Sequence, residues 1–273
     1  ARCDRFIKGL AKKSYSRARQ SRNVLRLALG LAVRLEVIPR NPMDGIARLH
    51  KPPHVPDAMT PAEVDAVRFA VAFWEMGLSK SGPKPDGQLS AIIEVMLGTS
   101  ARIGEVLALR VRDLHLEGGP PTIRIAGTIT NVKGKTAYRQ DHPKTARSRR
   151  TVVVPAFTAE AVKRRLVQLG DQSADALLFQ SRNGTALATN NVRRQLRRAL
   201  ELAGIEGVTP HSFRRAVATA VKDAANVELA AELLGHADPK ITIAHYVRRN
   251  ERVNPLTATV LEERFSPEWL RHE

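Results

Sequence analysis

The segment LLGHADPKITIAHYVRR (residues 233–249) carries His236 and Tyr246 in a chain that has only three tyrosines among 273 residues. A tyrosine hydroxyl has an unperturbed pKa of about 10 and is a weak nucleophile at neutral pH unless cations or a base assist it. The histidines and arginines around this tyrosine are of the right type to assist. The segment therefore predicts a reactive role for Tyr246.

A second segment, VTPHSFRRAVATAV (residues 208–221), has the pattern of a helix start. Thr209 is the expected cap and Pro210 the first helical residue, so His211 and Arg214 lie three apart on one face of the first turn. A helix start offers unsatisfied N–H groups and a partial positive charge, and an arginine can bind two phosphate oxygens at once. This segment predicts an anion site.

Two further segments carry matching residues. In TSARIGEVLALRV, Arg102 follows a Thr-Ser break and is the candidate for a second phosphate ligand, with Glu105 one turn later. In DHPKTARSRRTVVVP, Lys144 lies in a basic loop that leads into a strand, where its ammonium group can deliver a proton. Gly235 is the expected end of a helix before a turn that brings His236 and Tyr246 to the same place.

These residue types fit phosphoryl transfer. A phosphodiester attacked in line gains charge on its non-bridging oxygens, and two fixed arginines can stabilise that charge without a metal or other cofactor. Lys144 is the candidate donor of a proton to the leaving oxygen. Taken singly, each residue is more often structural, and we interpret Tyr15 and Tyr138 in that way. The ordered combination favours the chemical interpretation.

The charge of the chain predicts a polyanionic partner. It has 44 Lys and Arg against 27 Asp and Glu, a formal net charge of +17 and a pI near 10.8. Nucleic acid is the first candidate, because no run of about 18 apolar residues suggests a membrane. The single cysteine, Cys3, excludes an internal disulfide and fits a reducing cytosol, so a cytoplasmic location is expected.

The chain is expected to form two domains. Residues 1–51 hold thirteen Lys and Arg against three acidic residues, and residues 21–38 have helical spacing with Ser21 as the expected cap and another helix before it. Residues 52–59 contain three prolines and are expected to be an extended linker. Residues 60–273 form the second domain, with a C-terminal tail from about residue 251.

The second domain is expected to be mainly α with a small antiparallel β-sheet (α+β). Thr60 and Pro61 begin a helix, and two more helices flank the Gly-Thr-Ser break. The β-branched runs PTIRIAGTIT and RRTVVVP are the expected strands, and helices return from about residue 158.

The ordered set ARIGE, PKTARSRRTVVVP, HSFRR and LGHADPKITIAHY resembles the tyrosine recombinases, and within them the phage-type integrases. The resemblance covers about residues 55 to 250. It implies a DNA breaking and rejoining catalytic fold, a 3′-phosphotyrosyl intermediate with a free 5′-hydroxyl, and no need for ATP or metal. Carried onto this sequence, the catalytic residues are Arg102, Lys144, His211, Arg214, His236 and Tyr246, with Glu105 as a supporting carboxylate.

Two positions depart from the family's pattern. Arg215 stands where a histidine often follows the second arginine, and the interval of ten between His236 and Tyr246 is at the long end of what the family shows. Residues 1–51 resemble only the last helices of the family's core-binding domain. The tail, with Leu256 and Phe265 among its apolar residues, can pack on its own chain or on a neighbouring protomer.

The resemblance also implies partners. These are double-stranded DNA with attachment-type sites, a homotetramer on that DNA, and accessory bending or directionality proteins. Two alternatives remain: a type IB topoisomerase-like enzyme that relaxes DNA, and an integrase relic that binds DNA without cutting it. The candidate DNA contacts are Arg17, Arg19, Arg22, Lys133, Lys135, Arg147, Arg193 and Arg194.

Overall fold

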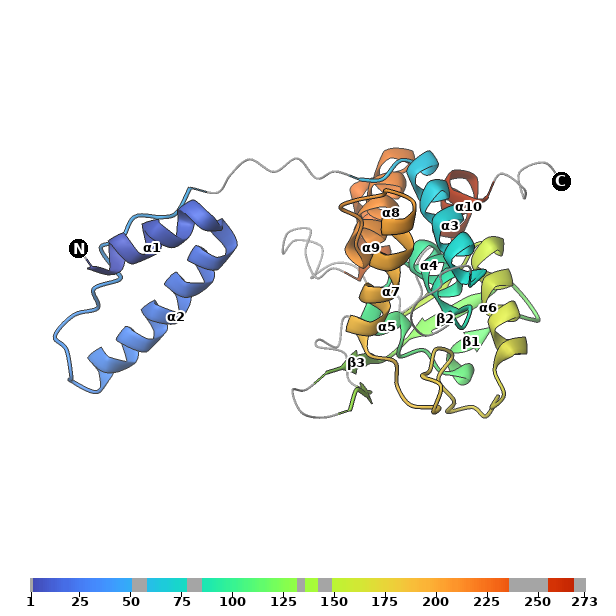
Figure 1. The fold of residues 1–273 in the computed structure, drawn as a ribbon, viewed down its shortest axis with the longest axis horizontal. Coiled ribbons are helices and arrows are strands. Elements are labelled where there is room, and N and C mark those ends of the chain that lie inside the picture. The colour runs from blue at the N-terminus through green and yellow to red at the C-terminus, as the bar shows by residue number, and fades with distance from the viewer. Residues whose placement is uncertain are drawn as a thin grey trace. The chain divides into compact units, whose positions relative to one another are not determined.

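The computed structural model describes residues 2–50, 58–77, 85–131, 136–141, 149–235 and 255–267. The chain divides into two compact units, Ala1–Pro56 and Asp57–Glu273 (Figure 1). Most of the described residues are helical, and the strands are short and antiparallel. The expected class, mainly α with a small antiparallel β-sheet, is confirmed.

The first unit contains two helices, α1 (Arg2–Lys13) and α2 (Tyr15–Arg34). The side chain of Ser14, which separates them, accepts a hydrogen bond from the backbone N–H of Arg17 at 3.3 Å and caps the second helix. The cap expected at Ser21 is therefore wrong, because the helix has already begun at Tyr15.

Few apolar side chains of the first unit are buried. Among its described residues, the fully buried apolar ones are Ile7, Ala18 and Met43. Other apolar side chains remain exposed along or just beyond α2: Val24, Leu27, Leu31, Leu35 and Val37.

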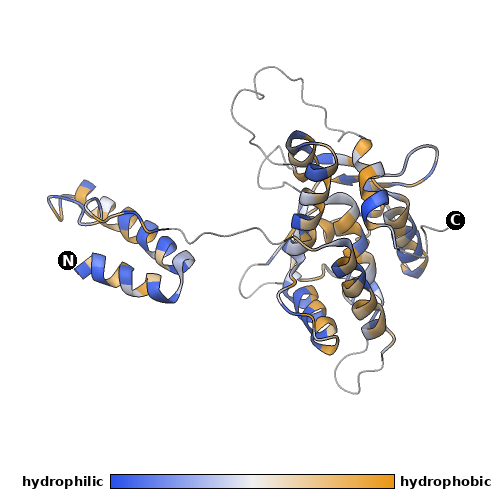
Figure 2. Ribbon diagram, turned by 90° about the horizontal axis from the view of Figure 1, so that it is seen from above, coloured by the Kyte–Doolittle hydropathy of each residue, from blue (hydrophilic) through white to orange (hydrophobic). Residues whose placement is uncertain are grey.

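Along most helices of the second unit, hydrophobic and hydrophilic residues alternate on the ribbon (Figure 2). Thr60 caps the first of them through a reciprocal pair of bonds with Glu63, and Pro61 is its first residue, as predicted. The helices are α3 (Pro61–Glu75), α4 (Gln88–Thr99), α5 (Ile103–Val106), the 3-10 turn η1 (Val111–Asp113), α6 (Ala156–Gln168), α7 (Thr189–Leu202), α8 (Pro210–Ala224), α9 (Val227–Leu234) and α10 (Leu256–Phe265).

The strands form two small sheets. Strands β1 (Leu114–His115), β2 (Thr122–Ile125) and β5 (Arg150–Val153) make an antiparallel sheet in the order β1-β2-β5, with Ile123 opposite Val152. Both expected β-branched runs therefore contribute a strand to this sheet, β2 from PTIRIAGTIT and β5 from RRTVVVP. The second part of the first run instead forms β3 (Thr128–Thr130), which pairs with β4 (Tyr138–Gln140) in a separate hairpin.

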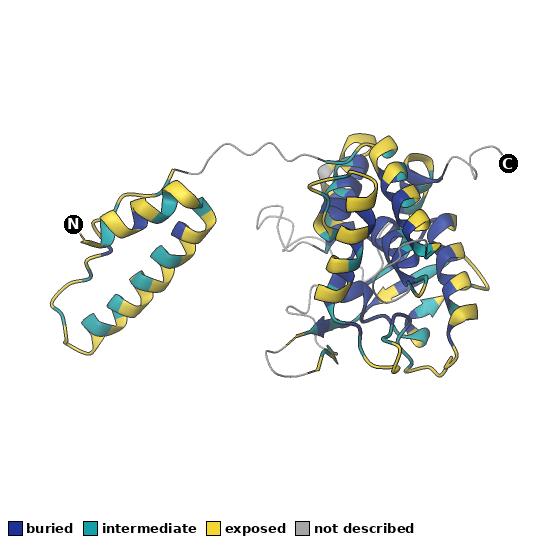
Figure 3. Ribbon diagram, viewed as in Figure 1, coloured by how far each residue is buried: buried dark blue, intermediate teal, exposed yellow. Residues whose placement is uncertain are grey.

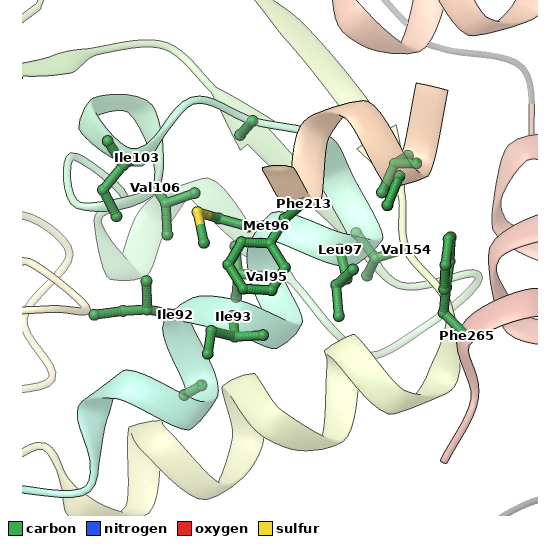
Figure 4. Close-up of a cluster of buried hydrophobic side chains, with 14 of the residues drawn as sticks. Ile92, Ile93, Val95, Met96, Leu97, Ile103, Val106, Val154, Phe213 and Phe265 are labelled. Atoms are coloured by element: carbon green, nitrogen blue, oxygen red, sulfur yellow. The ribbon is translucent and has the colours of Figure 1, made fainter. Parts of the chain in front are cut away.

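Helix α4 is the centre of the core. Ten of its twelve residues are buried, and it packs against α6, α8 and α3 (Figure 3). Its Val95 and Met96 lie beside Phe213 of α8 (Figure 4). Helix α10 packs on the same core through Leu261 and Phe265, so the described part of the tail packs on its own chain.

The close contact between α4 and α6 requires a glycine. A Cβ atom added to Gly98 would lie 2.0 Å from Oγ1 of Thr158, a fully buried residue whose hydroxyl donates to the Glu94 carbonyl at 3.1 Å. We expect Gly98→Ala to lower the free energy of unfolding by about 1–3 kcal/mol, as overpacking does, in a denaturant titration. Gly170→Ala is the control, because no heavy atom lies within 4 Å of its added Cβ. Equal stability of the two variants would contradict the steric argument.

Candidate active site

Arg102 lies at the start of a short helix that follows a sharp break in the chain. Helix α4 ends at Thr99, and Ser100 takes a left-handed conformation with φ of 54°. Arg102 is extended and immediately precedes α5, so the break predicted at Gly-Thr-Ser is confirmed. Its side chain is 48% exposed, and its guanidinium is therefore accessible to a ligand from solvent.

Glu105 binds Arg102 at two points. One carboxylate oxygen accepts the backbone N–H of Arg102 at 3.0 Å, and the other accepts its guanidinium at 2.9 Å. The guanidinium of Arg150 lies 3.4 Å from the same carboxylate. Burial opposes ionisation of Glu105, but the charge of Arg150 and the hydrogen bonds from Arg102 outweigh it, so its pKa lies below the ordinary value. Glu105 is therefore a carboxylate at neutral pH.

Helix α8 begins as the sequence predicts. The backbone N–H of Thr209 donates to Oγ of Ser212 at 3.1 Å, and Pro210 is the first helical residue. Phe213 is fully buried in the core and fixes the rotation of the helix (Figure 4). His211 consequently remains exposed, while Arg214 faces inward.

Arg214 joins segments that are distant in sequence. Its residue is only 4% exposed, and its guanidinium donates to the carbonyl of Ser100 and, at 2.6 Å, to that of Leu234. These two carbonyls lie at the ends of α4 and α9. Burial, followed by the charges of Arg102 and Arg150, lowers the pKa of Arg214 to about 9, which leaves the group protonated at neutral pH.

The surroundings of His211 favour its neutral form. Partial burial, and then the charges of Arg214, Arg215 and Arg102, lower its pKa below the ordinary value. A neutral imidazole offers one hydrogen-bond donor and one acceptor. His211 can therefore either donate to a phosphate oxygen or accept a proton.

Four of the predicted site residues come together in the structure: Arg102, Glu105, His211 and Arg214. The arginines at this place outnumber the carboxylate, since Arg102, Arg150 and Arg214 face Glu105. A site with such an excess of positive charge is suited to an anion with several oxygens, such as a phosphodiester.

Three predicted catalytic residues, Lys144, His236 and Tyr246, lie outside the described residues. One of them, His236, directly follows a described part of the site. Gly235 ends α9 in a left-handed conformation, as the sequence predicts, and Leu234 before it accepts from Arg214. His236 is the next residue.

Arg150 is a site residue that motif reasoning missed. It is the first residue of β5 and is 5% exposed. Strand alternation could have found it, because side chains two apart point to the same face and Val152 is buried. Strand alternation shows that Arg150 points to the buried face of β5, but it does not show that its partner is Glu105.

The candidate DNA contacts fall into three groups. Arg193 and Arg194 are exposed on α7, each bonded to an asparagine three residues earlier at 3.2 Å. Arg17 and Arg19 are exposed on α2, whereas Arg22 is half-buried and donates to the Ile46 carbonyl at 3.1 Å. Those outside the described residues are Lys133, Lys135 and Arg147.

The described parts of the chain contain no group of three or more His, Cys, Asp or Glu side chains arranged to hold a metal ion. Among the same residues, no helix has the length and apolar character needed to cross a membrane.

Comparison with known proteins gives a consistent match. The model of the phage integrase family matches residues 80–252. The integrase of Staphylococcus phage L54a is 29% identical over 177 residues, which cover 61% of this chain and 49% of that protein. The integrase of Mycobacterium phage L5 is 27% identical over 248 residues, covering 89% and 62%. The chain thus spans about half of the first relative and about three fifths of the second.

Two solved structures have a similar fold. The Tn1549 transposon integrase in complex with circular intermediate DNA is 20% identical with a TM-score of 0.66, over 91% of this chain and 81% of that one. A lambda integrase dimer bound to a COC′ core site is 16% identical with a TM-score of 0.60, again over 91% and 81%.

Proposed function

The chain belongs to the phage integrase family, and from this membership we propose that it is a site-specific tyrosine recombinase of a phage or another mobile element. In this proposal it cuts and rejoins duplex DNA through Tyr246. The observation that carries the proposal is the contact of Arg214 with the Ser100 carbonyl, two residues before Arg102. This contact holds Arg214 close to the segment that carries Arg102, and it supports a shared role of the two arginines in binding phosphate.

The proposed reaction is a transesterification. The scissile phosphate binds to Arg102 and Arg214, which stabilise the charge that develops on its non-bridging oxygens. The Tyr246 oxygen forms a bond to phosphorus and loses its proton to neutral His211. The bond from phosphorus to the 5′ oxygen breaks, and Lys144 supplies the proton that this oxygen takes up. The reverse sequence rejoins the strands.

We propose that DNA is bound by both units. Arg17 and Arg19 of α2 and Arg193 and Arg194 of α7 are exposed cations that suit phosphate contacts. In this proposal residues 1–51 belong to a helical DNA-binding domain, and residues 60–273 are catalytic. Assembly as a homotetramer on DNA, with accessory bending or directionality proteins, is part of the same proposal.

The experiment uses a pool of candidate attachment sequences as duplexes, each nicked just beyond the scissile phosphate so that cleavage releases a short fragment and cannot reverse. The protein is added with a metal chelator, and products are separated on a denaturing gel. A denaturant-resistant protein–DNA adduct is expected, with the modified peptide containing Tyr246. Sequencing the trapped DNA then gives the site.

Two further measurements, plasmid relaxation and DNA binding, separate the alternatives. A topoisomerase-like enzyme would relax supercoiled plasmids that lack the recovered site, whereas a recombinase would need that site. A relic would bind DNA with the steep salt dependence of phosphate contacts but form no adduct. Absence of the adduct under all conditions would contradict the proposed reaction.

A further inference from the structure

Arg150 is a buried cation near Arg102 and Arg214, the proposed phosphate ligands. The proposed reaction gives Arg150 no role. Its side chain is 4% exposed, against 48% for Arg102, and its guanidinium lies 3.4 Å from the carboxylate of Glu105. Burial lowers its pKa, and the charge of Glu105 opposes that shift. Arg150 is therefore placed to act on Glu105 within the protein and is shielded from solvent.

We propose that Arg150 is a positioning residue, which acts through Glu105 to hold the guanidinium of Arg102 in place for the phosphate. The proposal rests on the proposed function. Glu105 binds Arg102 through both the backbone N–H and the guanidinium, so its carboxylate must be ionised and fixed for either bond to be strong. Arg150 supplies the charge that keeps it so.

Arg150 also lies near the end of α9. A Cβ atom added to Gly235 would lie 3.1 Å from Nη1 of Arg150, and the φ of Gly235 is +62°. The guanidinium thus lies close to Gly235 and leaves little room for a side chain there. One side chain therefore pairs with the carboxylate that binds Arg102 and lies near the helix end that includes Leu234, which accepts from Arg214.

A double-mutant cycle distinguishes this role from a general contribution to folding. Arg150→Gln leaves Glu105 buried without its main counter-charge, whereas a second change, Glu105→Gln, removes the uncompensated carboxylate. We expect Arg150→Gln to slow adduct formation on the trapped site about 100-fold and Glu105→Gln to slow it about 10-fold, the range for a residue that orders a charge-stabilising group. We expect the double variant to be no slower than Arg150→Gln alone, because both changes remove one unit.

The pH dependence gives a second readout. Without Arg150, the pKa of Glu105 rises, so the rate of Arg150→Gln should increase with pH where that of the wild type is constant. Adding Glu105→Gln should abolish this increase. A purely structural role for Arg150 would produce no new pH dependence.

The matched control is Arg165→Gln. Arg165 is also buried, at 7% exposure, but its guanidinium donates to the Leu178 carbonyl at 2.9 Å, whereas that of Arg150 pairs with Glu105. Arg165→Gln should lower the melting temperature without changing the rate of adduct formation at 25 °C. Arg150→Lys keeps the charge and serves as the test variant if Arg150→Gln does not fold. It should react more slowly than the wild type but show no new pH dependence, because the ammonium still faces Glu105.

The outcomes are separable. If the wild type forms no adduct, the proposed function fails before this inference is tested. If the wild type reacts and Arg150→Gln behaves like Arg165→Gln, or if the losses of the two single variants multiply in the double variant, Arg150 does not act through Glu105.

Discussion

Tyr246→Phe is expected to bind the recovered DNA site as the wild type does and to form no covalent adduct. Phenylalanine keeps the aromatic ring but lacks the hydroxyl that attacks phosphorus. Because no covalent intermediate can form without the nucleophile, we expect the rate of adduct formation to fall on the order of 10⁴-fold or more. DNA affinity, measured by fluorescence anisotropy at two salt concentrations, should change less than about 2-fold, since the salt dependence reports the phosphate contacts of the basic side chains.

Tyr138→Phe is the matched control. Tyr138 lies in β4 and is 46% exposed, and its hydroxyl has no part in the proposed reaction. This variant should form the adduct at the wild-type rate. If Tyr246→Phe still formed the adduct and Tyr138→Phe did not, the nucleophile would be Tyr138 in the β3–β4 hairpin. The assignment of Tyr246 as the nucleophile would then be wrong.

Local signals in the sequence predicted the helix boundaries well. The pairs Thr60-Pro61 and Thr209-Pro210 begin helices, and Gly235 ends one in the left-handed conformation that glycine adopts without strain. Each of these signals acts over a few residues. Ser21 shows the limit, because a serine caps a helix only where the chain before it is not already helical, and Ser14 had begun that helix earlier.

Long-range contacts explain what the sequence did not reveal. The run TIRIAGTIT reads as one strand, but it divides at Gly127, where an added Cβ would lie 2.7 Å from the guanidinium of Arg139. Arg139 also donates to the Ala108 carbonyl at 2.7 Å and so fixes the second hairpin near α5. A contact between residues this far apart leaves no periodic pattern, and the second sheet was therefore not predicted.

The sequence predicted only part of the candidate site, because some of its residues are identified only by long-range contacts. Arg102, Glu105, His211 and Arg214 lie in motifs whose order carries the resemblance, and the structure brings them together. Arg150 belongs to the same motif as Lys144, but its importance comes from Glu105, 45 residues earlier in the chain. The tail illustrates a further limit, because an apolar helix such as α10 can pack on its own core or on a neighbour's.

Arg214→Gln is expected to have the largest effect among the described residues. Its guanidinium bonds to the Ser100 and Leu234 carbonyls and, in the proposed reaction, binds the scissile phosphate. One change therefore removes a charge from the proposed transition state and loosens two helix ends. We expect adduct formation to slow about 10³-fold, in line with the loss of an arginine that stabilises a phosphoryl transition state. Arg214→Lys should lose about 10²-fold, because an ammonium cannot span both carbonyls with a planar fork.

Arg215→Gln is the matched control for this change. Arg215 is the neighbouring arginine, is half-buried and donates to Oγ of Ser212 at 3.2 Å within its own helix turn. It should react within about 3-fold of the wild type, since Arg215 makes no proposed phosphate contact and its charge is a smaller cause of the lowered pKa of His211 than burial and Arg214. Melting temperatures of both variants separate lost chemistry from lost folding, because the unpaired Ser100 and Leu234 carbonyls also destabilise Arg214→Gln. If a folded Arg214→Gln cleaves as fast as Arg215→Gln, the buried arginine supports the helix ends alone, and Arg102 must bind the phosphate without it.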